Sequence, residues 1–270
     1  MHATVRHPAV AGRFYPGDRA ALLAEVQTYQ APAEQPIRAL GCIAPHAGYM
    51  YSGHVAGAVY ARLEIPRCSI LMCPNHTGMG VPLSIMSTGQ WETPLGAVPI
   101  DSELASSLKE RCPLLSEDRE AHRSEHAAEV QLPFLQARRS HLSFVPIALG
   151  TSHFEALEAL GEALAEVVAV QKEPVLIIAS SDMNHYESDH ITRIKDHKAI
   201  DRILALDPRG LYEVVMNENI SMCGFGPTVA MLTAAKKLGA TSAELIKYAT
   251  SGDVSGDRKM VVGYAGVAVR

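Results

Sequence analysis

The chain has 270 residues, and 24 Lys and Arg against 29 Asp and Glu give it a formal net charge of −5. Its 47% hydrophobic and 20% charged residues are the composition of an ordinary globular protein. The mild acidity, without any Lys/Arg cluster, argues against nucleic acid or an anionic membrane as the main partner. No apolar run approaches the ~20 residues that span a bilayer, and the N-terminal sequence lacks the apolar core of a signal peptide, so we expect a cytoplasmic protein.

Cysteine usage and the lack of repeats bear on domain organisation. The cysteines lie at positions 42, 68, 73, 112 and 223. An odd number scattered over a long chain is typical of reduced thiols rather than of a disulfide framework. Internal repeats and low-complexity tracts are absent from the sequence. We therefore predict one domain over residues 1–270.

Short apolar runs alternate with helical patterns, which is typical of α/β crossover units. The patterns predict, in chain order, a helix over 20–29, a linker over 30–36, a strand over 38–44, a helix over 53–63, strands over 68–73, 83–87 and 97–100, helices over 101–110 and 124–138, a strand over 144–149, a helix ending near 171, a strand over 174–179, helices over about 189–206, 208–217 and 227–238, and strands near 243–250 and 260–269. We expect 83–87 to pair with 97–100 across the turn-rich residues 91–96. Ser152 and Glu155 have capping-box spacing before the helix that ends near 171. The predicted fold is α/β, with a mixed, largely parallel central sheet flanked by helices.

Four of the apolar runs end in loops that each carry a histidine. These histidines are His46, His76, His153 and His185. In open α/β sheets, ligands bind outside the carboxyl ends of the strands. One such histidine would more often be a structural residue, but four in equivalent positions predict a shared cleft in which at least two face one another.

His46 and His76 are the best candidates for metal ligands. Each follows a predicted strand by two or three residues, and Gly48 and Gly78 beside them permit tight backbone turns. Neutral imidazole binds Zn, Cu, Fe or Ni, and the end of a strand holds the ring at a fixed angle. The alternative is that both histidines cap helices or form hydrogen bonds in a pocket without a metal.

Cys223 and His185 are further candidates. Cys223 precedes a predicted helix with Pro227 in its first turn, where the helix dipole favours a thiolate. It is a candidate ligand or nucleophile, or alternatively a small buried residue in a Gly-rich turn. Asp182 lies three residues before His185, and the two form a candidate acid/base pair because a carboxylate fixes the tautomer of an imidazole and raises its basicity. Asp182 would alternatively cap the following segment.

A competing motif lies near the middle of the chain. His122-Arg123-Ser124-Glu125-His126 matches the H-x-x-E-H pattern of inverted zinc proteases, so a zinc hydrolase is an alternative function. Because Ser124 is a predicted helix N-cap, His122 would lie outside the helix and would not share a face with His126. Glu125, His126, Glu129 and Gln131 would line the cleft or belong to a solvated helix face.

Several blocks of the sequence resemble the Memo family, in the same order and over nearly the whole chain. These blocks are residues 6–16 (RHPAVAGRFYP), 44–53 (APHAGYMYSG), 74–78 (PNHTG), 91–96 (WETPLG), 125–126 (EH), 131–135 (QLPFL), 180–186 (SSDMNHY) and 223–227 (CGFGP). In prokaryotes the family is also called AmmeMemoRadiSam system protein B. That name implies association with a radical SAM protein and an AMMECR-type partner.

The resemblance implies a fold like that of the class III extradiol dioxygenases, which are non-haem iron enzymes. Carried over by motif, His46 and His76 would be the two histidine ligands and Cys223 the third. His185 would match the acid/base histidine of the dioxygenases, with Asp182 beside it. Further candidate pocket residues in or beside these motifs are Tyr49, Asn75, Glu125 and His126.

The cysteine distinguishes this ligand set from that of the dioxygenases, which use two histidines and a carboxylate. A thiolate softens the site, so Fe(II) is favoured but Cu and Zn are also compatible, and the thiolate is itself oxidisable. The resemblance therefore implies metal-dependent redox chemistry of dioxygenase type on a small molecule or modified residue. The alternatives are a non-catalytic module that binds a peptide, a small ligand or a metal, and the zinc hydrolase above.

Overall fold

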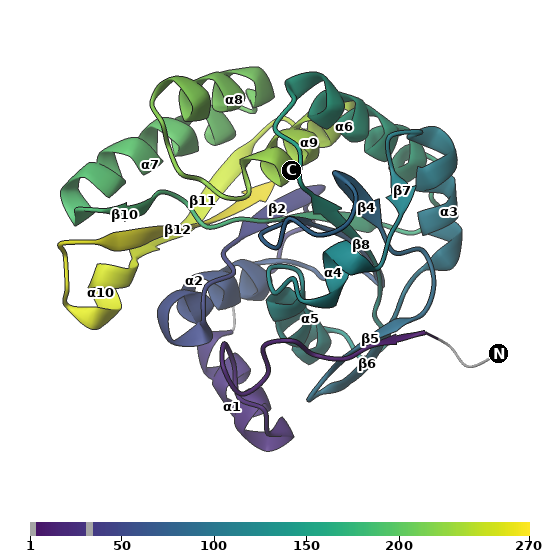
Figure 1. The fold of residues 1–270 in the computed structure, drawn as a ribbon, viewed down its shortest axis with the longest axis horizontal. Coiled ribbons are helices and arrows are strands. Elements are labelled where there is room, and N and C mark those ends of the chain that lie inside the picture. The colour runs from purple at the N-terminus through teal and green to yellow at the C-terminus, as the bar shows by residue number, and fades with distance from the viewer. Residues whose placement is uncertain (1–3, 31–34) are drawn as a thin grey trace.

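The computed structural model describes residues 4–30 and 35–270, so the predicted linker over 30–36 lies largely outside the described residues. A nine-stranded mixed sheet forms the centre of the fold, with strand order β10-β12-β2-β9-β3-β8-β4-β7 and with β11 paired to β12 (Figure 1). In that order the strands are His185–Glu187, Val261–Val269, Gly41–Ala44, Val175–Ser180, Cys68–Pro74, Ser143–Leu149, Leu83–Ile85 and Ser116–Glu117, and β11 is Ala243–Thr250. This sheet confirms the predicted α/β fold with a mixed central sheet.

The four inner strands are parallel. β2 pairs with β9, β9 with β3, and β3 with β8, while β12 and β4 run antiparallel on either side of them. β2, β3 and β9 are buried along their whole lengths, which explains why each reads as an unbroken apolar run. Their carboxyl ends lie at one edge of the sheet, where the loops after β2, β3 and β9 begin.

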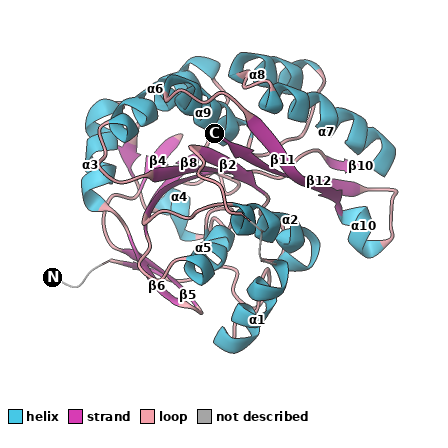
Figure 2. Cartoon of the chain, turned by 180° about the vertical axis from the view of Figure 1, so that it is seen from behind, coloured by secondary structure: helices cyan, strands magenta, loops and turns pink. Residues whose placement is uncertain are grey.

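Helices cover both faces of the sheet (Figure 2). One face packs against α3 (Ser102–Arg111), α6 (Phe154–Ala169), α7 (Asp189–Leu204), α8 (Pro208–Asn217) and α9 (Phe225–Lys237). The other packs against α1 (Arg19–Tyr29), α2 (Tyr49–Arg62) and α5 (Leu132–Arg138). Alternate residues of β3 serve the two cores, with Ile70 and Met72 in the first and Leu71 and Cys73 in the second. Among the described residues, no helix is long and apolar enough to cross a membrane.

The predicted pairing of 83–87 with 97–100 is wrong. β4 pairs with β8 of the central sheet, whereas β5 (Gln90–Thr93) pairs with β6 (Gly96–Pro99) and with β1 (Val5–Arg6) in a separate three-stranded sheet. Residues 91–93 therefore form a strand rather than part of a turn. Trp91 is fully buried, so packing of its side chain in the core stabilises the strand. The turn-forming residues that follow Trp91 in the sequence favour a turn and do not indicate this packing.

The predicted helix over 124–138 is also wrong. The chain instead forms α4 (Glu120–Arg123), a loop, a 3-10 turn over Glu129–Gln131, and α5. Glu125 and Glu129 are fully buried in this segment and accept hydrogen bonds from residues far away in the sequence. The backbone positions that make these bonds differ from those of a continuous α-helix. Pro133 lies in the first turn of α5, a position that proline favours because it lacks an N–H group.

Two helix starts differ from those predicted. α2 begins at Tyr49, four residues earlier than expected. α6 begins after His153, and the predicted capping box of Ser152 and Glu155 is not among the capping bonds that the described residues form. Another helix, α10 (Ser251–Ser255), has a capping box of its own between Thr250 and Asp253.

Asp196 of α7 is a fully buried carboxyl without a cationic partner among the described ion pairs. Its Oδ1 accepts the Asn184 backbone N–H at 2.8 Å, and its Oδ2 accepts the Tyr248 hydroxyl at 2.7 Å. Burial raises the pKa of Asp196 from 3.8 to about 7 despite these two bonds. The charged form is therefore unfavourable in the folded protein.

The substitution Asp196→Asn should remove a pH-dependent loss of stability. The unfolded chain ionises this carboxyl near pH 3.8 and the folded protein near pH 7, so the free energy of unfolding falls as the pH rises between these values. Urea unfolding of both proteins from about pH 5 to about pH 8 measures the effect. The stability of the wild type relative to the variant should fall with rising pH, by up to about 1.4 kcal/mol per unit. A difference that stays constant over this range would contradict the assignment.

Candidate metal centre

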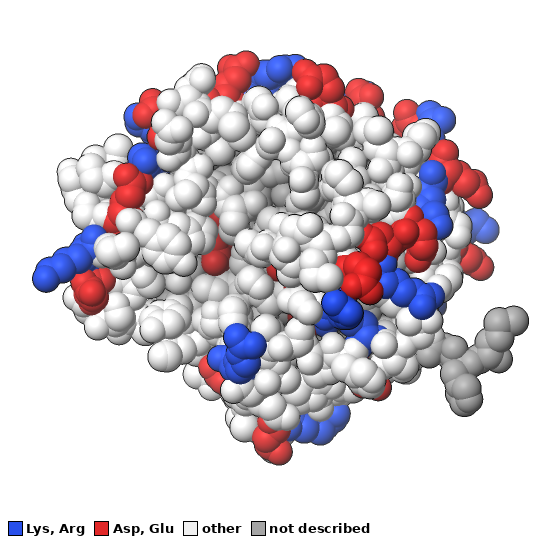
Figure 3. Space-filling model, in the orientation of Figure 1, with Lys and Arg blue, Asp and Glu red and all other residues white. Residues whose placement is uncertain are grey.

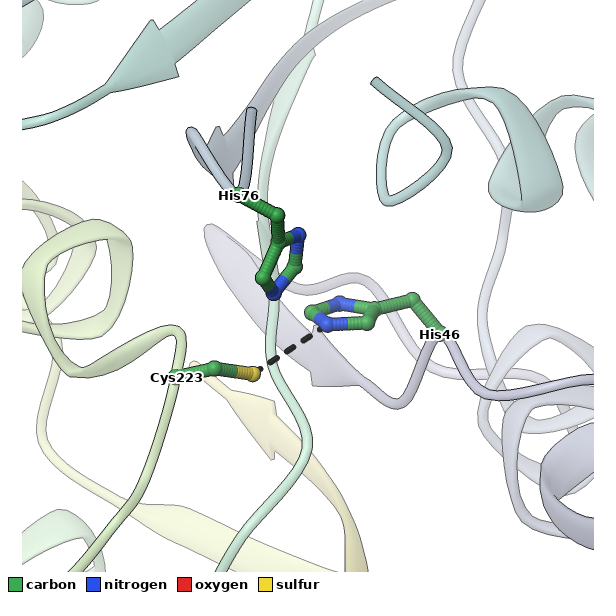
Figure 4. Close-up of side chains that lie close together, drawn as sticks. All are labelled: His46, His76 and Cys223. Carbon is green, nitrogen blue, oxygen red and sulfur yellow. Dashed lines mark hydrogen bonds between the residues drawn. The ribbon is translucent and has the colours of Figure 1, made fainter. Parts of the chain in front are cut away.

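Three residues that lie far apart in the sequence meet at the carboxyl edge of the sheet. His46 follows β2, His76 follows β3, and Cys223 precedes α9. One ligand atom from each lies within 4.8 Å of the others. The Cys223 Sγ is 3.2 Å from the His46 Nε2, and the two imidazole centroids are 5.2 Å apart (Figure 4). The structure thus brings together the three residues that the family resemblance implies as ligands.

Cys223 reaches the two histidines because the chain at Gly224 lies close to the end of β9. A Cβ at Gly224 would collide with the backbone oxygen of Ser180 and the side chain of Ser181. The Gly224 N–H also donates to the Ser181 Oγ at 3.1 Å. Glycine at this position therefore allows the start of α9 to approach the sheet and places the sulfur beside His46.

The carboxylate of Glu125 binds both the backbone and the ring of His76. This carboxylate is fully buried; its Oε2 accepts the His76 backbone N–H at 2.6 Å and its Oε1 lies 2.9 Å from the His76 Nδ1. Oε1 also accepts the Ala127 N–H at 2.9 Å. Since a carboxylate only accepts, the His76 Nδ1 carries a proton, and in the neutral ring Nε2 then has a free lone pair. Metal-binding histidines commonly have this carboxylate partner.

His46 is held by two residues that end β9 and begin the next loop. Its backbone N–H donates to the Asp182 Oδ1 at 2.7 Å, and its Nδ1 lies 2.9 Å from the Ser180 Oγ. His46 is only 2% exposed. The Nδ1 of each candidate histidine ligand is thus engaged by the protein, and the opposite edge of each ring faces the other and Cys223 (Figure 4).

His185 and Asp182 do not form the predicted pair among the hydrogen bonds of the described residues. The His185 Nδ1 lies 2.9 Å from the Ser221 carbonyl oxygen, and the His185 N–H donates to the Ser221 Oγ at 2.7 Å. Asp182 instead binds the His46 backbone. A backbone carbonyl, not a carboxylate, therefore fixes the tautomer of His185, with Nδ1 protonated and Nε2 free.

His126 completes a group of three histidines. Its ring stacks on His76 at 4.9 Å between centroids, lies 5.5 Å from His46, and packs against Phe14 at 4.7 Å. Its Nδ1 is 3.3 Å from the Glu125 Oε1. His76, Glu125 and His126 could also hold an ion, but the carboxylate of Glu125 is already engaged by His76 and Ala127.

Burial and mutual repulsion keep two of the histidines neutral. Burial, together with the charges of His126 and His76, holds the pKa of His46 well below its ordinary value. Burial also lowers the pKa of His126. Burial disfavours the charged form of Glu125, yet its hydrogen bond to His76 holds the carboxyl pKa at about 2. Against the effect of burial, the same bond raises the pKa of His76. Neutral imidazole is the form that binds metals.

Burial raises the pKa of both the Cys223 thiol and the nearby Asp182 carboxyl. Burial and the charge of Asp182 raise the pKa of Cys223. Burial likewise raises the pKa of Asp182, although its bond from the His46 backbone opposes this. The apo site therefore holds Cys223 as a thiol, and ion binding would release its proton, because coordination deprotonates a thiol.

Some predicted site residues lie elsewhere. His153 is an exposed residue at the start of α6. Tyr49 is buried among aromatic rings, and its hydroxyl donates to the Val130 carbonyl. The Asn75 side chain closes its own loop, accepting from Thr77 and Gly78 through Oδ1. These side chains support the fold or the loops around the site.

The zinc hydrolase alternative is not supported by the geometry. His122 is 1% exposed, packs edge-on against Trp91 at 5.7 Å, and belongs to neither of the metal-capable groups of the described residues. Burial lowers the pKa of His122 to about 4. His126 lies beyond the end of α4, so the two histidines of the motif do not share a helix face.

The N-terminal segment is anchored to the same loop by Glu129. This fully buried carboxylate accepts hydrogen bonds from the Arg6 guanidinium at 2.7 Å, the Ala9 N–H at 2.7 Å, the Val10 N–H at 3.0 Å and the Tyr15 hydroxyl at 2.6 Å. The local sequence gives no sign of this anchor, because no periodicity or motif links Arg6 or Tyr15 to a glutamate 114 to 123 positions away. The anchor holds the segment that packs Phe14 on His126.

A cavity of about 610 Å3 lies between this segment and α4. His126 and Phe14 line it, so it adjoins the histidine group. Its lining also includes Arg13, Arg119 and Arg123. Among the ion pairs of the described residues, Arg123 pairs with a glutamate and the other two have no partner. In Figure 3, acidic and basic side chains lie near the edge of this face and in a cluster to the right of its hollowed centre, and some acidic atoms are visible inside the hollow.

Comparison with known proteins identifies the family. A family model described as Memo-like protein matches residues 6–268. The chain is 42% identical to a MEMO1 family protein of Methanopyrus kandleri, over 98% of this chain and 99% of that protein. It is 46% identical to a MEMO1 family protein of Methanosarcina barkeri, over 98% and 100%. The chain belongs to the Memo-like family. The predicted family resemblance is therefore confirmed.

A solved structure supports the fold of this Memo-like protein. An uncharacterised protein of Escherichia coli K12 aligns with a TM-score of 0.54 and 13% identity, over 86% of this chain and 100% of that one. At this identity the similarity shows the fold alone.

The substitution Glu129→Ala should strongly destabilise this Memo-like protein. It would leave the buried Arg6 guanidinium unpaired, and breaking a buried ion pair in this way costs about 3–5 kcal/mol. Urea unfolding measures the effect, with Glu120→Ala as the matched control because the Glu120 side chain is 55% exposed and its loss should cost no more than about 0.5 kcal/mol. Equal stability of the two variants would contradict the anchoring role of Glu129.

Proposed function

We propose that this Memo-like protein binds a transition metal, with Fe(II) favoured, through His46, His76 and Cys223 and carries out redox chemistry of dioxygenase type on a small molecule. The observation that carries this proposal is the convergence of two imidazole edges and one sulfur within 4.8 Å. Both histidines have Nδ1 engaged, which leaves Nε2 as the ligand atom.

The donor set fits such an ion. Two imidazoles and a thiolate suit Fe(II), Cu and Zn, whereas ions such as Mg²⁺ and Ca²⁺ prefer oxygen ligands. Three protein ligands at the end of a sheet leave further coordination positions for other molecules, which is the arrangement of catalytic rather than structural sites. When bound, Fe(II) supplies one-electron chemistry with oxygen that protein side chains lack.

The chain's own residues have separate roles in this proposal. Glu125 and Ser180 orient the two imidazoles. His185, which is close enough for its charge to lower the pKa of His46, has a free Nε2 and transfers protons to or from the substrate. Asp182 positions the His46 loop through its backbone bond.

The ligand is proposed to be a small organic anion. The 610 Å3 cavity beside His126 is within the usual size range of small-molecule sites. Two of its arginines have no acidic partner among the described ion pairs, and guanidinium groups bind carboxylate and phosphate well. The radical SAM and AMMECR-type partners stay predictions of the family resemblance.

Metal analysis of anaerobically purified protein tests the site. The double variant His46→Ala/His76→Ala should lose the metal that the wild type retains, because two of three ligands are gone. The matched control is His141→Ala/His153→Ala, which removes two exposed histidines outside the site and should keep the metal. Equal metal content in the wild type and the site variant would remove the proposed centre.

Oxygen uptake tests the redox chemistry separately from metal binding. The Fe(II)-loaded wild type should consume oxygen with some members of a panel of dihydroxybenzoates and neutral catechols. His185→Gln should keep the metal but slow turnover by about 10²–10⁴-fold, since a proton-transfer group is lost. A loaded wild type that consumes no oxygen with any member would contradict the redox proposal and favour the non-catalytic binding module.

A further inference from the structure

A chain of buried hydrogen bonds leads from α2 to the ring of His46. The Tyr60 hydroxyl donates to the Gln131 Oε1 at 2.8 Å, and the Gln131 Nε2 donates to the Ser180 Oγ at 2.8 Å. The Ser180 Oγ donates to the Ala127 carbonyl oxygen at 2.6 Å and lies 2.9 Å from the His46 Nδ1. Tyr60, Gln131 and Ser180 are fully buried, so water does not compete for these bonds.

The orientation of the Gln131 amide follows from its neighbours. Its Nε2 is also 3.0 Å from the Pro45 carbonyl oxygen. A carbonyl oxygen only accepts, so the atom facing Pro45 is the amide nitrogen, and the oxygen faces Tyr60. The Gln131 amide therefore presents an N–H donor to Ser180.

A count of protons then fixes the state of His46. Ser180 has one hydroxyl proton, which goes to the Ala127 carbonyl because that oxygen cannot donate. The remaining capacity of the Ser180 Oγ is to accept, from Gln131 and from His46. The His46 Nδ1 must therefore carry a proton. In the neutral ring this leaves Nε2 unprotonated, 3.2 Å from the Cys223 Sγ.

We propose that Ser180, held by Gln131 and Tyr60, is a positioning residue that locks His46 in the Nδ1–H tautomer and so preforms the metal-binding lone pair on Nε2. The inference rests on the proposed metal site for its purpose but not for its geometry. The other tautomer would direct the Nδ1 lone pair at the oxygen of Ser180, which has no proton left to donate. It would also place a proton between Nε2 and the ion.

The two histidine ligands are therefore oriented by partners of different charge. Glu125 presents a carboxylate to His76, whereas Ser180 presents a neutral hydroxyl to His46. A neutral partner fixes the tautomer without stabilising the imidazolium, so His46 stays ready to bind a cation. Ser180 and Gln131, 49 positions apart, thus orient the ring of His46, whereas Glu125 alone orients the ring of His76.

Long-range ¹⁵N–¹H NMR of the metal-free, histidine-labelled protein tests the tautomer directly. Wild-type His46 should show a protonated Nδ1 and an unprotonated Nε2. Ser180→Ala removes the acceptor and should move His46 wholly or partly to the Nε2–H form, with Cys223 as the nearest acceptor. Ser180→Thr keeps the hydroxyl and should restore the wild-type pattern. An Nε2–H tautomer in the wild type, or an unchanged tautomer in Ser180→Ala, would overturn the proposal.

Zinc affinity by chelator competition gives the functional consequence. Ser180→Ala should lower the affinity about 10–100-fold, as is typical for lost partners of metal-binding histidines, and Ser180→Thr should lower it much less. The matched control is Ser69→Ala, because Ser69 is also a fully buried strand serine and its hydroxyl has no partner among the described residues. Urea midpoints of all variants separate a loss of fold from a loss of positioning.

The outcomes distinguish a failure of the proposed metal site from a failure of the positioning role of Ser180. If the wild type binds no zinc, the proposed metal site fails, while the NMR result on metal-free protein still decides the tautomer. If Ser180→Ala folds and binds zinc as tightly as the wild type, the positioning role fails and the metal site stands. If Ser180→Ala does not fold, the wild-type spectrum and Ser180→Thr decide the proposal.

Discussion

The buried carboxylate of Glu125 is the interaction on which the arrangement of the candidate centre depends. It accepts both the backbone N–H and the ring N–H of His76, and it also binds the N–H of Ala127. An ionised carboxylate is costly to bury, and these charge-assisted bonds offset that cost. The loop after β3 is thus tied to the loop that follows α4.

The same short segment also supports the second histidine. The Ala127 carbonyl oxygen accepts a hydrogen bond from the Ser180 hydroxyl, and the Gln131 amide donates one to the Ser180 Oγ. Residues 125–131 therefore hold Ser180, which orients His46, and also include Glu125, which orients His76. Glu129, between them, binds the N-terminal segment. Three buried polar side chains in seven residues therefore connect two sheet loops and the N-terminal segment from Arg6 to Tyr15. Such a fully satisfied network favours one conformation, because each member would be left unpaired in any other.

The sequence was informative where burial is apolar and periodic. The inner strands are unbroken apolar runs, so the sheet and the loops carrying His46 and His76 followed from the pattern. The local sequence of Cys223 leaves its role open, and only the family resemblance implies that it is a ligand. In the structure its sulfur lies 3.2 Å from the His46 Nε2.

The sequence was least informative where polar side chains are buried. Residues 124–138 read as one helix because the pattern does not show that Glu125, Glu129 and Gln131 bond to residues 49 or more positions away. For the same reason, spacing paired Asp182 with His185, whereas the structure pairs Asp182 with the backbone of His46. Long-range hydrogen bonds decide these positions, and they leave no local periodicity.

The central claim is that one ion contacts two imidazoles and the sulfur of Cys223 at the same time. X-ray absorption spectroscopy of the zinc-loaded wild-type protein measures this most directly. The account predicts imidazole nitrogen neighbours at about 2.0–2.1 Å and one sulfur neighbour at about 2.3 Å. A spectrum with nitrogen and oxygen neighbours but no sulfur would contradict it.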